Sequence, residues 1–236
     1  MGAEATNRHW RTMSVTTGIA GLAGIVLVAA SQALLLAGAS EPDFDAPAAE
    51  IVTFFEAQNE TATEAGAFLG QLALLAIAWF VVGVWAVLRH AEGDPAWRSA
   101  AALVSGVVFV ALVMTGGWQL ATFRLADGVD PQLARLAFDM GNLGFANGWL
   151  ALGSFLLAAG WIFLTAGSLP NWLGWLALAA ALGFVVGRAF WTTAIWLIPY
   201  SLFWIWTIAV SVQLLRGRMR SAPSQAQFDR LGRGME

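Results

Sequence analysis

Apolar residues occur along this chain in six long stretches that are separated by short polar segments. A helix needs about 20 mostly apolar residues to cross the hydrocarbon core of a membrane, and most of these stretches reach that length. The pattern predicts membrane-spanning helices at residues 14–39, 62–88, 100–123, 143–166, 172–187 and 192–215. We therefore expect an all-α fold, a polytopic transmembrane bundle of six helices.

The polar segments predict smaller elements between the spans. Ile51, Phe54 and Phe55 recur at helical spacing in the first loop, which predicts a short amphipathic helix there. Packing of this helix over the mouth of the bundle is favoured over contact with lipid or a partner. Asp130 followed by Pro131 is typical of a helix start, and predicts a short helix at 131–139 that leads into the fourth span.

Two local signals refine the second and sixth spans. Thr61 with Glu64 three residues later predicts a capping box at the start of the second span. Pro199 lies inside the predicted sixth span, where a proline removes a backbone donor. We therefore expect a kink or hinge in that helix beside Tyr200.

Composition favours a membrane protein over a soluble domain. The chain is 58% hydrophobic and 11% charged, whereas a soluble domain carries roughly 25% charged residues. So little charge leaves too little polar surface to coat a soluble fold of 236 residues. The predicted organisation is a cytoplasmic N-terminus at 1–13, one six-helix domain at 14–215 and a flexible basic tail at 216–236.

The arginines predict how the bundle is oriented. Those on the side of the chain termini are Arg8, Arg11, Arg89, Arg98, Arg216, Arg218, Arg220, Arg230 and Arg233, and those on the other side are Arg124, Arg135 and Arg188. Basic residues concentrate on the cytoplasmic side of membrane proteins. We expect a multi-pass protein of the cytoplasmic membrane with both termini inside. A signal peptide cleaved near 37–39 is the alternative for the first span, but its apolar run is longer than a signal core.

Missing residue types limit the chemistry. The chain has no cysteine, and every one of its basic residues other than histidine is arginine. Disulfides, thiolate metal sites, cysteine nucleophiles and lysine Schiff bases are therefore excluded. No Asp, Glu, Arg or His falls near the middle of a predicted span, which argues against a proton-coupled carrier. We expect no metal site and no cofactor.

The polar residues within and beside the spans crowd toward the predicted outer side. The candidate ligand-binding residues are Gln71, Gln119, Arg124, Asp139, Asn142, Asn147, Arg188 and Tyr200. An unpaired amide or charge is unfavourable in hydrocarbon by several kcal/mol, so we expect these side chains to face one another. Asp139 is expected to pair with Arg124 or Arg188. The alternative is that the charged members lie in lipid headgroups and the amides only join helices.

The sixth span adds a polar and aromatic stripe at helical spacing. Its members are Thr193, Trp196, Tyr200, Trp204, Thr207 and Ser211. Buried packing is favoured over a cofactor wall for this stripe. Gly66 with Gly70, Gly144 with Gly148, and Gly183 with Gly187 form Gly-xxx-Gly pairs, which allow close helix approach. Packing within one protomer is favoured over a dimer seam for all three pairs.

The order of these segments resembles an uncharacterised family of six-span bacterial integral membrane proteins. The matching features are the sequence Ala-Ala-Glu-Ile-Val-Thr-Phe-Phe-Glu at 48–56 and an Arg-containing inner loop after the second span. Further matches are Ser-Leu-Pro-Asn-Trp-Leu-Gly-Trp at 168–175 and a last span that ends Leu-Leu-Arg at 214–216. The resemblance covers most of the chain and implies a six-helix fold. It implies no activity and transfers no catalytic residue.

The leading hypothesis is a membrane protein, not an enzyme, whose outward-facing polar vestibule binds or passes a small polar or amphiphilic molecule. The alternative is an accessory or structural subunit of a larger membrane complex, with the acidic first loop as its contact. An intramembrane enzyme is the weakest hypothesis because the sequence has no metal cluster, thiol or nucleophile–base pair. The expected partners are membrane lipids, such a ligand, and a membrane-protein partner or second copy of the chain. Nucleic acid is not expected.

Overall fold

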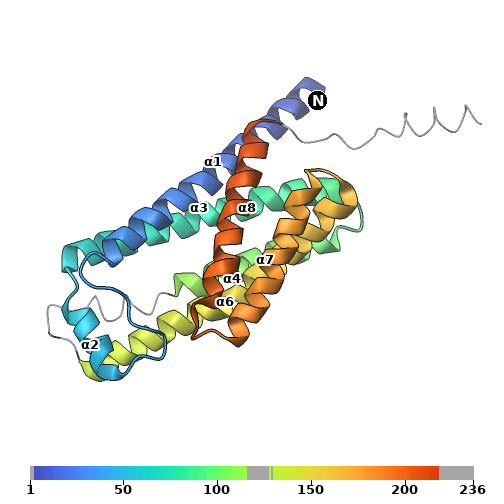
Figure 1. The fold of residues 1–236 in the computed structure, drawn as a ribbon. Coiled ribbons are helices and arrows are strands. Elements are labelled where there is room, and N and C mark those ends of the chain that lie inside the picture. The colour runs from blue at the N-terminus through green and yellow to red at the C-terminus, as the bar shows by residue number, and fades with distance from the viewer. Residues whose placement is uncertain (1–2, 116–127, 129, 218–236) are drawn as a thin grey trace, which may run out of the picture.

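The computed structural model describes residues 3–115, 128 and 130–217, with side chains from residue 7 onward, and this part of the chain is helical between its turns (Figure 1). The elements are α1 (Ala3–Leu35), α2 (Ala48–Glu56), α3 (Glu60–Glu92), α4 (Trp97–Met114), α6 (Pro131–Ala166), α7 (Asn171–Ala189), the 3-10 turn η2 (Ala194–Trp196) and α8 (Leu197–Leu215). All but α2 belong to segments long and apolar enough to cross a membrane. The predicted all-α fold with six spans is confirmed.

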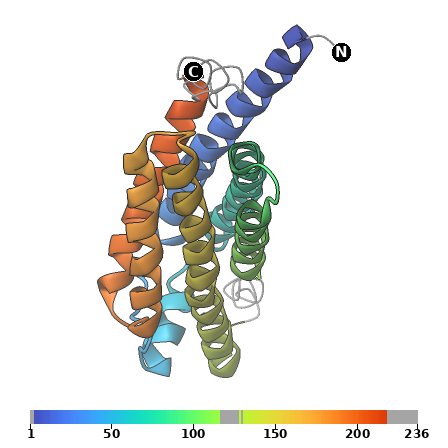
Figure 2. The same cartoon turned by 90° about the vertical axis from the view of Figure 1, so that its right-hand side faces the viewer.

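The six long helices form a closed ring in which chain order is also spatial order. α1 packs on α3, α3 on α4, α4 on α6, α6 on α7 and α7 on α8, and α8 returns to α1. Successive helices run in opposite directions, so both ends of the described chain lie at one end of the bundle (Figure 2). We call this the termini end. The opposite end, which carries α2, is the α2 end.

Local signals explain where two of the long helices begin. The Asp130 side chain accepts hydrogen bonds from the backbone N–H groups of Gln132 and Leu133, at 2.8 and 3.0 Å, and Pro131 occupies the first helical position. The predicted N-cap is confirmed. The capping box predicted for α3 is wrong, because the N-cap is Asn59, whose side chain accepts from the Ala62 N–H at 2.9 Å.

Two other helices differ from their predictions. The short helix expected at 131–139 is the first part of α6, which continues unbroken to Ala166. Pro199 does not kink a helix, because α8 starts only at Leu197. In the first turn of a helix the backbone N–H groups have no partner within the helix, so a proline there removes no helical hydrogen bond.

The short helix α2 covers the α2 end of α6. Its Ile51, Phe54 and Phe55 are buried and form a cluster with Ala134, Ala137 and Phe138 of α6. The amphipathic helix predicted from their spacing is confirmed, and its apolar face packs on the bundle. Residues of the same chain therefore cover the apolar face of α2.

Glycines set the closeness of several helix crossings. A Cβ atom added at Gly21 of α1 would lie 2.7 Å from the Phe80 ring of α3 and would also meet Ser211 of α8. The predicted Gly-xxx-Gly pairs all face other helices of the same chain. Gly66 and Gly70 face α1, Gly144 and Gly148 face α4, and Gly183 and Gly187 face Pro199 and Trp196. Packing within one protomer accounts for each pair.

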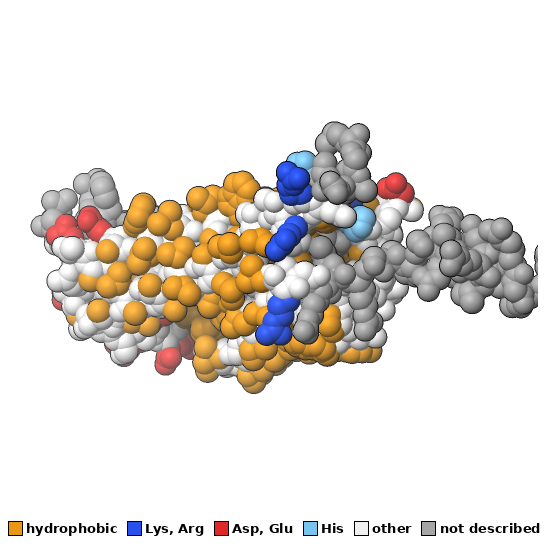
Figure 3. Space-filling model, turned by 90° about the horizontal axis from the view of Figure 1, so that it is seen from above, with side chains coloured by type: hydrophobic (Ala, Val, Ile, Leu, Met, Phe, Trp, Pro, Cys, Tyr) orange, Lys and Arg blue, Asp and Glu red, His pale blue; other side chains and the backbone are white. Residues whose placement is uncertain are grey.

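Large apolar side chains cover the outside of the ring. Val26, Val104 and Leu182 expose 67%, 63% and 68% of their surface. Figure 3 shows this apolar cover along the length of the molecule, with arginines toward the termini end and acidic residues mostly toward the α2 end. Soluble monomers rarely expose continuous apolar patches of more than a few hundred Å². The protein is a multi-pass integral membrane protein.

Candidate functional site

A cavity of about 450 Å³ lies inside the ring at the α2 end. Its walls come from α1, the loop after α1, α3, α4, α6, and the segment formed by η2 and α8. On every helix the lining residues belong to the half nearer the α2 end. A space of this size falls within the range of small-molecule pockets in proteins.

The polar residues in the cavity wall come from four helices and one loop. They are Ser31, Gln32, Glu41, Thr63, Gln71, Asn142 and Tyr200. Three of them, Gln71, Asn142 and Tyr200, belong to the set predicted from the sequence, and the cavity brings them together from α3, α6 and α8. No arginine, lysine or histidine occurs among the described lining residues.

Asn142 is a buried polar residue of the cavity wall. Only 4% of its surface is exposed, and its Nδ2 atom has no hydrogen-bond partner within the described residues. A buried amide without a partner lowers stability by about 1–3 kcal/mol. Ser31 differs, because its hydroxyl donates to the Gly66 carbonyl at 2.7 Å. The Asn142 amide nitrogen is thus a buried hydrogen-bond donor in the cavity wall that the described chain leaves unused.

Aromatic rings form a connected part of the wall. Phe44 stacks on Trp196 with ring centroids 6.0 Å apart, and Trp196 lies 5.6 Å from Phe145. Tyr200 follows, 5.4 Å from Phe145 and 5.4 Å from Trp204. All five rings line the cavity. Trp196, Tyr200 and Trp204 of the sixth-span stripe therefore face an open space, while Thr207 and Ser211 further along are buried.

Packed aromatic residues close the bundle toward the termini end. Trp206 is fully buried, and its ring lies 6.1 Å from Phe80, 5.8 Å from Phe155 and 6.2 Å from Phe163. Phe80 follows the lining residue Ile77 by one helical turn. The cavity therefore ends where this aromatic cluster begins.

The cavity also separates α1 from α8 at the α2 end. The close α1–α8 approaches at Gly18 and Gly21, against Ser211, lie in the termini half. Further along, the lining residues Gln32 of α1 and Leu197 of α8 are both exposed, Leu197 to 49%. In Figure 1 the two helices diverge toward the α2 end. Exposed lining residues on both helices leave the cavity accessible on this side of the ring, which we call the opening.

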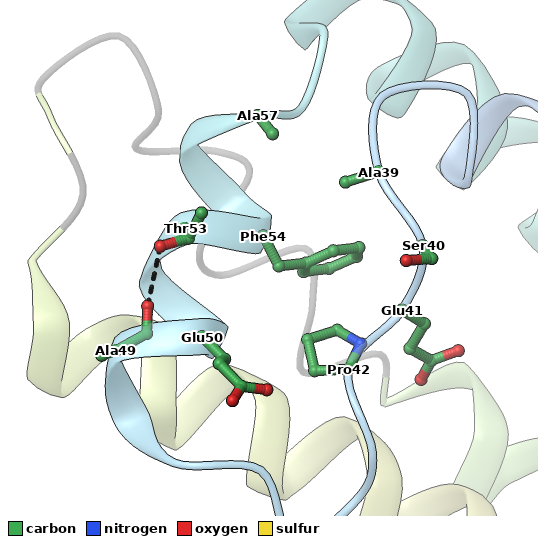
Figure 4. A pocket seen from close by; sticks show the side chains of 9 residues that line it. All are labelled: Ala39, Ser40, Glu41, Pro42, Ala49, Glu50, Thr53, Phe54 and Ala57. Atoms are coloured by element: carbon green, nitrogen blue, oxygen red, sulfur yellow. Dashed lines mark hydrogen bonds between the residues drawn. The ribbon is translucent and has the colours of Figure 1, made fainter.

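The loop between α1 and α2 crosses near this opening. Phe44 in the loop stacks on Trp191, with centroids 5.8 Å apart, as well as on Trp196, so the loop is attached to the turn between α7 and α8. Glu41 of the same loop lines the cavity. It also lines a smaller pocket of about 420 Å³, where Glu50 and Phe54 of α2 lie opposite it (Figure 4).

Glu41 lies at an exposed position of the loop, but its carboxyl pKa is shifted. Its side chain borders the open space of both pockets, yet the surrounding protein displaces water and raises its pKa from 4.5 to about 7. No hydrogen bond or ion pair to Glu41 exists within the described residues. The acidic character of the loop was evident in the sequence, but the position of Glu41 beside the cavity required the fold.

Three predicted site residues lie outside the cavity wall. Arg188 of α7 donates to the Asn147 Oδ1 of α6 from Nε at 3.1 Å and from Nη2 at 3.0 Å. Asp139 pairs with Arg135 one turn earlier on α6, at 3.8 Å. The predicted Arg188–Asp139 ion pair is therefore wrong, because each residue has a nearer partner. Gln119 and Arg124 lie outside the described residues.

A second polar cluster, at the termini end, is structural. The Glu92 carboxylate accepts from the backbone N–H groups of Arg98 and Ser99, at 3.0 and 2.8 Å, and from Arg98 Nε at 2.8 Å. Arg98 also donates to Thr165 at 3.1 Å and lies 5.2 Å from the Trp161 ring. Glu92, the last residue of α3, thus caps α4. Arg98 joins α4 to α6. Sequence reasoning missed this cluster, and its long-range part could not be read from the chain because Thr165 lies far from Arg98 in the sequence.

Comparisons of the chain with protein-family models, curated proteins and solved structures give no match. The resemblance to the six-span bacterial family stays a prediction. The function is therefore argued from the cavity alone.

Proposed function

We propose that the protein binds an amphiphilic molecule in the cavity at the α2 end, and that the ligand enters from the membrane between α1 and α8. The observation that carries this proposal is a cavity of about 450 Å³ with an unpartnered Asn142 amide in its wall. A ligand with a hydrogen-bond acceptor would satisfy that amide, and its apolar part would contact the apolar side chains in the deep part of the cavity.

The chemistry of the wall supports an amphiphile over a fully polar ligand. Leu74, Ile77 and Phe109 line the deep part, while Gln32 and Glu41 lie near the opening. Burying apolar ligand surface against such side chains contributes about 25 cal/mol per Å². A sugar or a small inorganic ion would leave this surface without matching contacts.

The aromatic cluster around Trp206 supports binding over passage. Transfer through the ring would require Trp206 to separate from Phe80, Phe155 and Phe163, which it contacts on several sides. The proposal therefore assigns a binding function, and the opening between α1 and α8 serves both entry and exit.

Narrowing the cavity tests this proposal. Ala67 of α3 lines the cavity, so Ala67→Phe should occupy part of it. Ala65 lies two residues earlier on the same helix and is exposed, which makes Ala65→Phe the matched control. The measurement is the melting temperature of the protein in lipid nanodiscs with a panel of single-chain amphiphiles.

We expect at least one amphiphile to raise the melting temperature of the parent protein and of Ala65→Phe. Ala67→Phe should lose most of that stabilisation because the added ring competes with the ligand for space. Equal stabilisation of both variants would show that the cavity is not the binding site. Failure of every amphiphile to stabilise the parent would contradict the proposal directly.

A further inference from the structure

We propose that the ligand of the cavity is an amphiphilic organic cation, whose alkylated ammonium group lies between Glu41 and the rings of Phe44, Trp196 and Tyr200. This inference rests on the proposed function and names the chemical class of its ligand. Its evidence is the combination of one carboxylate, a connected aromatic wall and the absence of basic groups from the described lining.

The aromatic wall has the composition of a cation site. The faces of Trp, Tyr and Phe rings attract ammonium groups within about 6 Å, and aromatic cages recognise quaternary ammonium ligands. Phe44, Trp196, Phe145 and Tyr200 are linked by centroid distances of 6.0, 5.6 and 5.4 Å. Rings this close together can present several faces and edges to one small headgroup.

Glu41 supplies the negative charge that such a ligand requires. Within the described chain its carboxylate has no cationic partner, although it lies at the cavity wall. An anionic ligand would be repelled by Glu41 and would find no basic side chain among the described lining residues. Arg188, which could attract an anion, bonds to Asn147 outside the wall.

This arrangement makes binding depend on pH. The pKa of Glu41 is raised to about 7 because the surrounding protein displaces water, so the carboxyl group is mostly neutral below that pH and mostly charged above it. The other titratable groups that face the two pockets are Glu50 of α2 and Tyr200 of α8. A quaternary ammonium ligand does not titrate. Its affinity should therefore rise as the pH increases from 6 to 8, and the bound cation should lower the pKa of Glu41.

Two probes with the same decyl chain test the charge requirement. Decyltrimethylammonium carries a fixed positive charge, whereas decyldimethylphosphine oxide has a neutral headgroup of similar size. Their dissociation constants are measured with the full chain in phosphatidylglycerol nanodiscs, below the micelle concentration of each probe. Repeating the measurement in phosphatidylcholine nanodiscs distinguishes a lipid headgroup from a free amphiphile, because a bound choline headgroup would compete with the cationic probe.

The variants separate charge from packing. Glu41→Gln should reduce the affinity for decyltrimethylammonium about tenfold at pH 8 and abolish its pH dependence, while Ser40→Ala in the same loop should change neither. Trp204→Leu removes a ring from the wall and should weaken the binding of the cationic probe more than that of the neutral probe. Trp79→Leu, at a position 62% exposed on the lipid-facing side, is its control.

The outcomes distinguish this inference from the proposed function. Tighter binding of the cationic probe, with loss of that preference in Glu41→Gln, supports both. Equal affinity for the two probes, unchanged in Glu41→Gln, overturns the cation class and leaves the amphiphile site standing. Absence of binding by either probe in both lipids overturns the cation class, and the panel used with Ala67→Phe then decides the proposed function.

Discussion

Two asparagines on α6 show how the same side chain takes different roles at different positions. Asn147 is exposed and accepts two hydrogen bonds from Arg188, which joins α6 to α7. Asn142, five residues earlier, is buried in the cavity wall with its amide nitrogen unpartnered within the described chain. Asn147 therefore contributes to stability, whereas Asn142 lowers stability and remains available to a ligand.

Leucine substitutions at these positions should have opposite effects. Asn142→Leu removes an unpaired buried amide and should raise the free energy of unfolding by about 1 kcal/mol. Asn147→Leu removes the hydrogen-bond acceptor of Arg188 and should lower the free energy of unfolding. Both are measured by equilibrium unfolding in mixed detergent micelles without added ligand. A loss of stability in Asn142→Leu would identify that amide as a structural contact between helices.

At the scale of elements, α1 holds the termini half of the ring together. Its glycines face both α3 and α8, with Gly24 against Ile77 and Gly18 against Leu215. Near the α2 end, the residues of α1 on the side of α8 either line the cavity or are exposed. Close packing at one end and separation at the other leave the opening beside the cavity.

Gly21→Leu should separate these helices. A side chain at Gly21 would meet Phe80 and Ser211, and overpacking of this kind lowers stability by about 1–3 kcal/mol. Ala29→Leu on the exposed side of α1 is the control and should be neutral. The comparison uses the free energy of unfolding and the yield of monodisperse protein. Equal stability and yield of the two variants would contradict the close approach of α1 to α3 and α8 at Gly21.

At the scale of the whole molecule, charge is distributed unequally between the two ends. Arg8, Arg11, Arg89, Arg98 and Arg216 lie at the termini end, and Arg135 and Arg188 lie at the α2 end. From this excess of arginine we propose that the termini end lies on the cytoplasmic side of the membrane. The cavity would then open in the outer half of the membrane.

Reporter fusions test this orientation. Alkaline phosphatase is active only after export, so a fusion at Ala46 should be active and a fusion at the C-terminus inactive. A fluorescent protein that folds only in the cytoplasm should give the reverse result. Activity of the phosphatase at the C-terminus alone would invert the proposed topology.

The sequence by itself determined the six spans, the helix α2 and the Asp130 cap, because hydropathy, helical spacing and capping chemistry act over a few neighbouring residues. It also identified Gln71, Asn142 and Tyr200 as polar residues that belong together, since amides in hydrocarbon require partners. The predicted Arg188–Asp139 ion pair was wrong because residue type alone does not select among partners at a similar depth in the membrane.

Only the tertiary structure decided which of these polar residues face a common space. Closure of the ring by α8 on α1 places residues from five helices and one loop around the cavity, and it brings Glu41 and Phe44 to the same wall. That outcome depends on the angles and distances at which helices cross. Those are determined by contacts such as Gly21 with Phe80 and Ser211, between residues that lie far apart in the chain.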